Sequence, residues 1–242
     1  TSLLEKRGPC LEALIPGPVY RGMRDGKLVR FEEIARTAPA LQDALLSILS
    51  ERAASIPELS GDDSTLFARE GFNIIGTSNT SDEGVNVMSA ALKRRMNFET
   101  IRPISAVEDE IGVVLRESTR LLEQASVPVN PDETIVRALT IIFHELRNGQ
   151  TLDGRSTDRL AGAVMSTAEA VTVCHAMGVY AYYYREGTMT AEDITDFLIG
   201  AAVKDKLTDL KRINHYMDTE VTRKEGEVWR AIEDNWRRVY RG

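Results

Sequence analysis

The pattern of apolar residues changes near residue 104, and this change limits the folds that the chain can adopt. Before it, two β-rich runs at residues 27–31 and 72–77 are bounded by glycines and polar turns, which is typical of buried strands. Apolar residues at helical spacing over residues 41–49 predict an amphipathic helix between the two runs. A further strand-like run covers residues 98–101. The order strand, helix, strand indicates neighbouring strands of a mostly parallel sheet.

Helix signals follow one another after residue 104, where the strand signals vanish. A capping-box pattern formed by Ser105 and Glu108 predicts the first of these helices. Further helices are predicted to begin at Asp132 and at residues 190–193. The last is predicted over residues 222–240, with the following side chains on its buried face: Trp229, Ile232, Trp236 and Val239.

These patterns predict a chain of the α/β class that is divided into two parts. An incomplete α/β domain with a mostly parallel sheet is predicted at residues 1–103, and an all-helical domain at residues 104–242. With 242 residues, the chain is long enough to bury a substantial core. Its first residue is Thr1 rather than Met, and we expect the sequence to begin inside a larger protein.

Charge and cysteine content exclude several classes of function. The formal net charge of −7 argues against a protein that coats nucleic acid, because such proteins concentrate Lys and Arg to displace counterions. The two cysteines, Cys10 and Cys174, lack the close spacings of zinc sites and indicate a reducing, cytoplasmic compartment. The apolar stretches fall far short of the roughly 20 residues that span a bilayer, so no membrane insertion is expected.

Two adjacent carboxylates form the first candidate site. Glu32 and Glu33 follow the run at residues 27–31, at the carboxyl end of a predicted strand, where ligands bind in open α/β sheets. One carboxylate there can hold the Mg²⁺ shell of a phosphoryl-transfer site, and the other can polarise the attacking water. The alternative is a solvated acidic pair at a strand end, because two adjacent acids alone are a weak motif.

Asn79 is the second candidate, within residues 76–80 at the end of the next predicted strand. There its amide can orient a water molecule or contact a terminal phosphate. An asparagine after a strand is also ordinary turn chemistry, and this alternative stays open.

Three cations close a short predicted helix within residues 88–98: Lys93, Arg94 and Arg95. Cations at a helix carboxyl terminus stabilise the helix dipole, which is the simpler explanation. The second explanation is an arginine finger, which reaches a phosphate bound by a neighbouring subunit and offsets the charge of the transition state.

Together, the order and spacing of these features resemble the MoxR family of AAA+ ATPases. The resemblance covers most of residues 9–102 and extends over most of the chain through similarities in the helical part. It implies a partial AAA+ core with three αβα layers and a mostly parallel sheet, followed by an all-α lid domain. The segments that carry it are residues 14–20, 28–34, 42–52, 76–80, 88–96, 151–154, 166–170 and 201–205.

The resemblance gives each candidate residue a role with ATP and Mg²⁺. Glu32 takes the position of the metal-side acid, where the family usually has Asp, and Glu33 that of the water-activating acid. Asn79 falls on the sensor 1 position. Arg95 falls on the arginine finger, with Arg94 as the second choice, because the family's Asp-Arg-Phe stands opposite Arg-Arg-Met here.

The lid departs from the family at its sensor 2 arginine. Ala168 stands at the corresponding position, so that arginine is missing or is replaced by Arg155 or Arg159 from the preceding turn. In that case Arg155 or Arg159 contributes to nucleotide binding. The alternative is that both are surface or ion-pair arginines.

By resemblance, the intact protein hydrolyses ATP to remodel or mature a client protein. A ring of identical subunits, a hexamer in the family, and a von Willebrand factor A-domain partner are implied as well. The sequence contains no Gly-x-x-x-x-Gly-Lys-Ser/Thr, so the phosphate-binding loop is expected upstream. The alternative function is a non-catalytic fragment or scaffold module that binds a partner protein through its helical domain. A DNA-linked motor is the least favoured alternative because of the acidic balance.

Overall fold

The computed structural model describes residues 5, 8–79, 88–157, 165–203 and 207–240. Contacts divide the chain into two units, Thr1–Thr100 and Ile101–Gly242, and each unit is described by itself. The fold is a partial AAA+ α/β core followed by a helical domain, as the sequence predicts.

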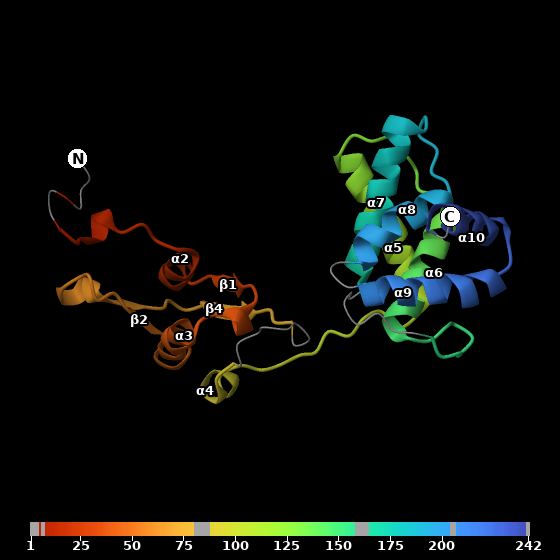
Figure 1. The fold of residues 1–242 in the computed structure, drawn as a ribbon. Helices are drawn as coiled ribbons and strands as arrows, with labels where there is room; N and C mark the ends of the chain where they lie inside the picture. The colour runs from red at the N-terminus through yellow and green to blue at the C-terminus, as the bar shows by residue number, and fades with distance from the viewer. Residues whose placement is uncertain (1–4, 6–7, 80–87, 158–164, 204–206, 241–242) are drawn as a thin grey trace. The chain divides into compact units, whose positions relative to one another are not determined.

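A pair of parallel strands forms the centre of the first unit (Figure 1). Strand β1, Leu28–Phe31, pairs in parallel with β4, Asn73–Gly76, and Phe31 stands opposite Gly76. The predicted strands are therefore confirmed. Their starts lie close together because Gly26, in the left-handed region, approaches the carbonyl oxygen of Glu70 so closely that a Cβ would lie 2.2 Å from it. Glycine alone tolerates both the conformation and the contact.

Helix α2 precedes β1 in the sequence, and helix α3 follows it. Helix α2, Pro18–Asp25, ends at Gly26, and helix α3, Pro39–Glu51, confirms the helix predicted between the strands. An antiparallel hairpin that the sequence did not reveal follows α3, with β2 at Ala53–Ser55 and β3 at Thr65–Phe67. Short 3₁₀ turns lie at Leu11–Ala13, Ile34–Arg36 and Gly61–Ser64.

The short helix α4, Ala90–Lys93, lies near the end of the first unit and is tied to α3. The hydroxyl oxygen of Ser89 caps it by accepting a hydrogen bond from the amide of Leu92. The buried Gln42 of α3 accepts a hydrogen bond from the amide of Ser89. The strand predicted at residues 98–101 is wrong: this segment forms no strand, and Phe98 and Ile101 are exposed, since no described strand lies alongside to pair with it.

The second unit contains all the helices after residue 104. They are α5 at Val107–Gln124, α6 at Glu133–Asn148, α7 at Thr167–Tyr184, α8 at Glu192–Ala202, α9 at Leu207–Thr219 and α10 at Glu227–Tyr240, with a 3₁₀ turn at Val221–Arg223. Helix α6 lies at the centre of the apolar core, where Leu139, Ile142, Phe143 and Leu146 are fully buried. None of the described helices is both long and apolar enough to cross a membrane.

Of two predicted helix starts in this unit, one is confirmed and one is wrong. Asp132 caps α6 through hydrogen bonds from the amides of Thr134 and Ile135, at 2.8 and 3.2 Å, which confirms that start. The capping box expected from Ser105 and Glu108 is wrong, because Ala106 is the N-cap of α5. The carboxylate of Glu108 instead receives two hydrogen bonds from Arg137, at 2.6 and 2.9 Å.

The last helix also differs in detail from its prediction. Helix α10 begins at Glu227, because Val221–Arg223 forms a separate 3₁₀ turn before it. Ile232 and Trp236 are buried as expected, and Trp229 is half-buried. Val239 is exposed, in the last turn of the helix, so its predicted place on the buried face is wrong.

Candidate functional site

Thr77 connects the carboxyl ends of the two parallel strands. Its amide donates a hydrogen bond to the carbonyl oxygen of Phe31, and its own carbonyl oxygen accepts one from the amide of Ile34, both at 2.9 Å. The two residues between these anchors are Glu32 and Glu33. The turn that carries both acids is therefore closed against the segment that follows β4.

The carboxylate of Glu32 is held at both oxygens. Its Oε2 accepts a hydrogen bond from the hydroxyl of Thr77, at 2.5 Å, and its Oε1 lies 2.7 Å from Nε of Arg30. Arg30 and Glu32 lie two residues apart and so share a face of the extended chain. Because both side chains are largely exposed, the ion pair contributes little to stability and leaves Glu32 open to a ligand.

Glu33 occupies a strained part of the backbone map. Its φ and ψ of 53° and 45° are left-handed, which costs a residue with a Cβ about 1–2 kcal/mol. Its amide donates a hydrogen bond to the hydroxyl oxygen of Thr77 at 3.2 Å, which helps to hold this conformation. Such strain is concentrated at functional sites, where the surrounding structure fixes it.

The carboxylate of Glu33 has one oxygen without a hydrogen bond in the described part of the chain. The side chain is 46% exposed, yet its Oε2 atom is shielded and has no hydrogen-bond partner among the described residues. The nearest cation is Arg36, whose Nε lies 3.6 Å from Oε2, beyond hydrogen-bonding distance. Because the side chain as a whole is exposed, water or a ligand can approach this carboxylate, as a general base requires.

Asn79 follows Thr77 by two residues and is exposed. The parallel pairing of β1 with β4 brings its segment to the same sheet edge as Glu32 and Glu33. The structure thus places three predicted site residues at one edge, where open parallel sheets bind their ligands.

The donors at this edge suit Mg²⁺. The carboxylate of Glu32 offers hard oxygen ligands, which this ion prefers. No group of three or more His, Cys, Asp or Glu side chains that could hold a metal occurs in the part of the chain that the structure describes. Mg²⁺ needs none, because it is commonly held by one or two carboxylates together with substrate phosphates and water.

Arg94 and Arg95 lie apart from this edge. Arg95 donates hydrogen bonds to the hydroxyl of Ser50 and to the carbonyl oxygen of Ala91. Ser50 is in the last turn of α3, whereas Glu33 precedes the 3₁₀ turn that leads into its first turn. The helix rises about 1.5 Å per residue, so the 11 steps from Pro39 to Ser50 span roughly 16 Å. Arg95 is thus held near the far end of α3.

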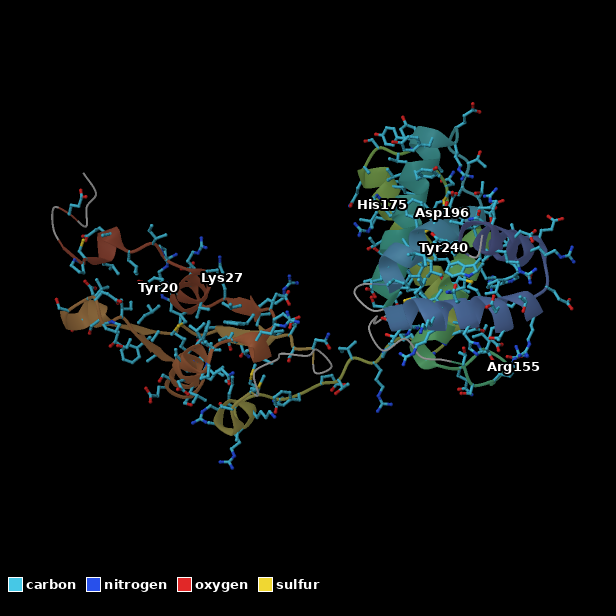
Figure 2. All side chains as sticks on the ribbon, in the orientation of Figure 1. Tyr20, Lys27, Arg155, His175, Asp196 and Tyr240 are labelled. Atoms are coloured by element: carbon cyan, nitrogen blue, oxygen red, sulfur yellow. The ribbon has the colours of Figure 1, made fainter. Side chains whose placement is uncertain are left out.

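Arg155 is occupied within the helical unit. It lies on the loop between α6 and α7 (Figure 2), with its guanidinium 3.0 Å from carboxylate oxygens of both Glu220 and Asp153. This is the ion-pair alternative that the sequence left open for it. Arg159 lies outside the described residues. Ala168 is exposed in the first turn of α7.

Sequence reasoning missed Thr77 and Arg30. Thr77 stands within the segment that was singled out for Asn79, but its importance depends on strand register. Because Phe31 pairs with Gly76, the residue that follows β4 meets the turn that follows β1. Arg30 and Glu32 are two residues apart, a spacing that places both side chains on the same face of a strand. This spacing was the signal from which their contact could have been predicted.

Two family descriptions match this chain. Residues 108–241 match the YehL-like AAA+ ATPase C-terminal domain, and residues 9–96 match the AAA domain of the dynein-related subfamily. The chain is also similar to a protein of Escherichia coli (strain K12) named uncharacterized protein YehL, with 46% identity over 231 residues. The alignment covers 95% of the chain, which spans 63% of the relative's length.

Proposed function

Because the chain belongs to the family of YehL-like AAA+ ATPases, we propose that it supplies the hydrolysis residues of an ATPase site, with Glu33 activating the attacking water. One observation carries this proposal: Glu32 and Glu33 lie together at the carboxyl end of β1, beside the end of β4 that leads to Asn79. A strained Glu33 with an exposed side chain, whose Oε2 has no hydrogen-bond partner among the described residues, fits a general base.

Each acid has a separate task in the proposed reaction. Glu33 accepts a proton from water as the water oxygen bonds to the γ-phosphorus of ATP and the bond to the β,γ-bridging oxygen breaks. The products are ADP and inorganic phosphate. Glu32 would hold Mg²⁺, which neutralises phosphate charge when it is bound. Asn79 orients the water or contacts the terminal phosphate.

A longer protein would supply the phosphate-binding loop, which the sequence of this chain lacks. The relative is longer than this chain, which leaves room for such a segment. The exposed face of the sheet also supports the proposal. Leu28 and Ile75 lie on one face of the β1–β4 pair and are 58% and 52% exposed, whereas parallel sheets are normally covered on both faces.

The proposed assembly is a ring, a hexamer by resemblance to MoxR proteins, in which an arginine that follows α4 reaches the nucleotide of the neighbouring subunit. The separation of Arg95 from Glu33 along α3 supports action between subunits. Head-to-tail contacts that close generate such rings. A client protein and a von Willebrand factor A-domain partner, acting in the cytoplasm, complete the proposal.

The test compares steady-state ATP turnover and ATP binding in the full-length protein. Glu33→Gln keeps the shape of the side chain but removes the base, so we expect turnover to fall about 10²–10⁴-fold while ATP stays bound. Glu58→Gln, at an exposed position of the β2–β3 connection, is the matched control and should turn over ATP like the unaltered protein. Equal turnover in both variants would remove Glu33 from this role.

Exposed tyrosines favour a second function, partner binding through the helical unit. Tyr183 and Tyr184, at the carboxyl end of α7, are 68% and 76% exposed, whereas Tyr180 packs edge-on against Phe197. Exposed tyrosines are common in protein interfaces. If full-length protein binds no ATP, a scaffold role of this kind replaces the ATPase proposal.

A further inference from the structure

We propose that Thr77 is a positioning residue that sets the geometry of both acids through one hydroxyl group, an inference that rests on the proposed ATPase function. Thr77 makes hydrogen bonds to four consecutive residues, which are Phe31, Glu32, Glu33 and Ile34. Two of these bonds use its backbone and would survive substitution. The other two use its hydroxyl.

The hydroxyl group can serve both acids because it has one proton and two lone pairs. Its proton goes to Oε2 of Glu32, and a lone pair accepts the amide proton of Glu33. The first bond aims the carboxylate of Glu32. The second supports the left-handed backbone of Glu33 and so fixes the direction in which its side chain leaves the turn.

Threonine suits this position better than a more flexible residue. Its branched Cβ restricts χ1, so the hydroxyl is held toward the turn with little loss of entropy. The backbone bonds of Thr77 to Phe31 and Ile34 fix the main chain from which the hydroxyl projects. Thr77, which follows β4, thus fixes the position of the two acids that follow β1.

Loss of the hydroxyl should affect chemistry more than nucleotide binding. Groups that orient metal ligands and bases typically contribute 10–100-fold to metal affinity or activity. Thr77→Val preserves shape and removes the hydroxyl, so we expect kcat to fall 10–100-fold, with a KM for ATP within about threefold. The Mg²⁺ concentration for half-maximal turnover should rise, because the carboxylate of Glu32 is no longer aimed.

The experiment uses the full-length protein with Thr77→Val, Thr77→Ser and Thr65→Val. Thr77→Ser restores the hydroxyl and should recover turnover to within about threefold of the unaltered protein. Thr65→Val makes the same change at an exposed position of β3 and should have no effect. Binding of a fluorescent ATP analogue, with and without Mg²⁺, gives a readout besides turnover, and thermal melting shows that each variant is folded.

The outcomes separate this inference from the function on which it rests. A low kcat and a raised Mg²⁺ concentration for half-maximal turnover in Thr77→Val, with recovery in Thr77→Ser, support the positioning role. If Thr77→Val melts below the assay temperature, Thr77→Ala takes its place with the same expected result. Unchanged turnover without the hydroxyl, or an equal loss in Thr77→Ser, overturns the inference. Glu33→Gln measured alongside tests the proposed site: if it is fully active, Glu33 is not the base and its proposed role fails whatever Thr77 does.

Discussion

The guanidinium group of Arg95 donates a hydrogen bond to the hydroxyl of Ser50, which ties helix α4 to the last turn of α3. Its neighbour Arg94 is exposed and makes no side-chain hydrogen bond or ion pair within the described parts of the chain. Of two adjacent arginines, one is therefore held and oriented by its own subunit, while the other extends into solvent. By resemblance, Arg95 is the arginine finger. Its orientation by Ser50 agrees with this role, because a finger must present its charge at a fixed place.

Substitution of the two arginines should separate their roles. We expect Arg95→Ala to lower ATP turnover in full-length protein by about 10³-fold, because a finger arginine offsets charge in the transition state. Arg94→Ala is the matched control and should lower it less than tenfold. Mixing Arg95→Ala subunits with Glu33→Gln subunits should restore part of the activity, because some interfaces regain both groups. A larger loss in Arg94→Ala would assign the finger to Arg94 instead.

Two helical glycines should respond to alanine with opposite signs. A Cβ at Gly178 of α7 would lie 2.8 Å from both methyl carbons of the buried Leu122, so Gly178→Ala should lower the free energy of unfolding by about 1–3 kcal/mol. Gly112 of α5 has open space around it, and Gly112→Ala should raise that free energy by up to about 1 kcal/mol. Urea denaturation measures both. Stabilisation by both changes would show that α5 and α7 are not in close contact.

Acid should weaken the helical unit through Glu110. Burial opposes ionisation of this carboxyl, but hydrogen bonds from Arg147, His144 and Thr167 outweigh it and lower its pKa below the ordinary value of 4.5. A carboxylate with a lowered folded pKa stabilises the fold above its unfolded pKa. This stability is therefore present at neutral pH and is lost as pH falls from about 4.5 through the folded pKa.

Glu110→Gln measures that contribution. Because it leaves Arg147 buried without its countercharge, we expect the variant to lose about 3–5 kcal/mol of unfolding free energy at pH 7. The loss should shrink as pH falls below 4.5. Glu108→Gln is the control in the same first turn of α5. Glu108 is exposed and pairs with Arg137, so the loss of unfolding free energy should be small. A loss that is equal in both variants and independent of pH would contradict this account.

The two thiols should differ in reactivity. Burial raises the pKa of Cys174 to about 11, although a hydrogen bond from Ser118 acts in the opposite direction. At pH 8 its thiolate fraction is then about 0.1%, and access is blocked as well. Iodoacetamide should label the half-buried Cys10 of the native protein first, and Cys174 after unfolding, as mass spectrometry can show. Equal labelling rates without denaturant would place Cys174 in an open part of the fold.

Much of the architecture followed from sequence periodicity. The strands β1 and β4, the helix between them and the start of α6 at Asp132 each had a local signal, which was a β-rich run between turn residues, helical spacing or a capping residue. The capping box at Ser105 failed because the distant Arg137 engages Glu108 instead. The hairpin of β2 and β3 escaped prediction because its strands have three residues each, too few to show a period.

The sequence predicted the residues of the candidate site but not the hydrogen bonds between them. Glu32, Glu33 and Asn79 were found because they follow predicted strands. The bond from Thr77 to Glu32 depends on the register of two strands 45 residues apart, which no local pattern records. The left-handed backbone of Glu33 is equally hidden, since glutamate is not a residue that favours this conformation.

The most direct test of the central claim is a single-turnover measurement of γ-phosphate cleavage in the full-length protein, with enzyme in excess over labelled ATP. This experiment isolates the chemical step from nucleotide exchange. With Glu33 acting as the base, cleavage in Glu33→Gln should slow at least 100-fold while the labelled ATP remains bound. Cleavage at the unaltered rate in Glu33→Gln would contradict the account, because the water would then be activated without the carboxylate that the strand and turn hold in place.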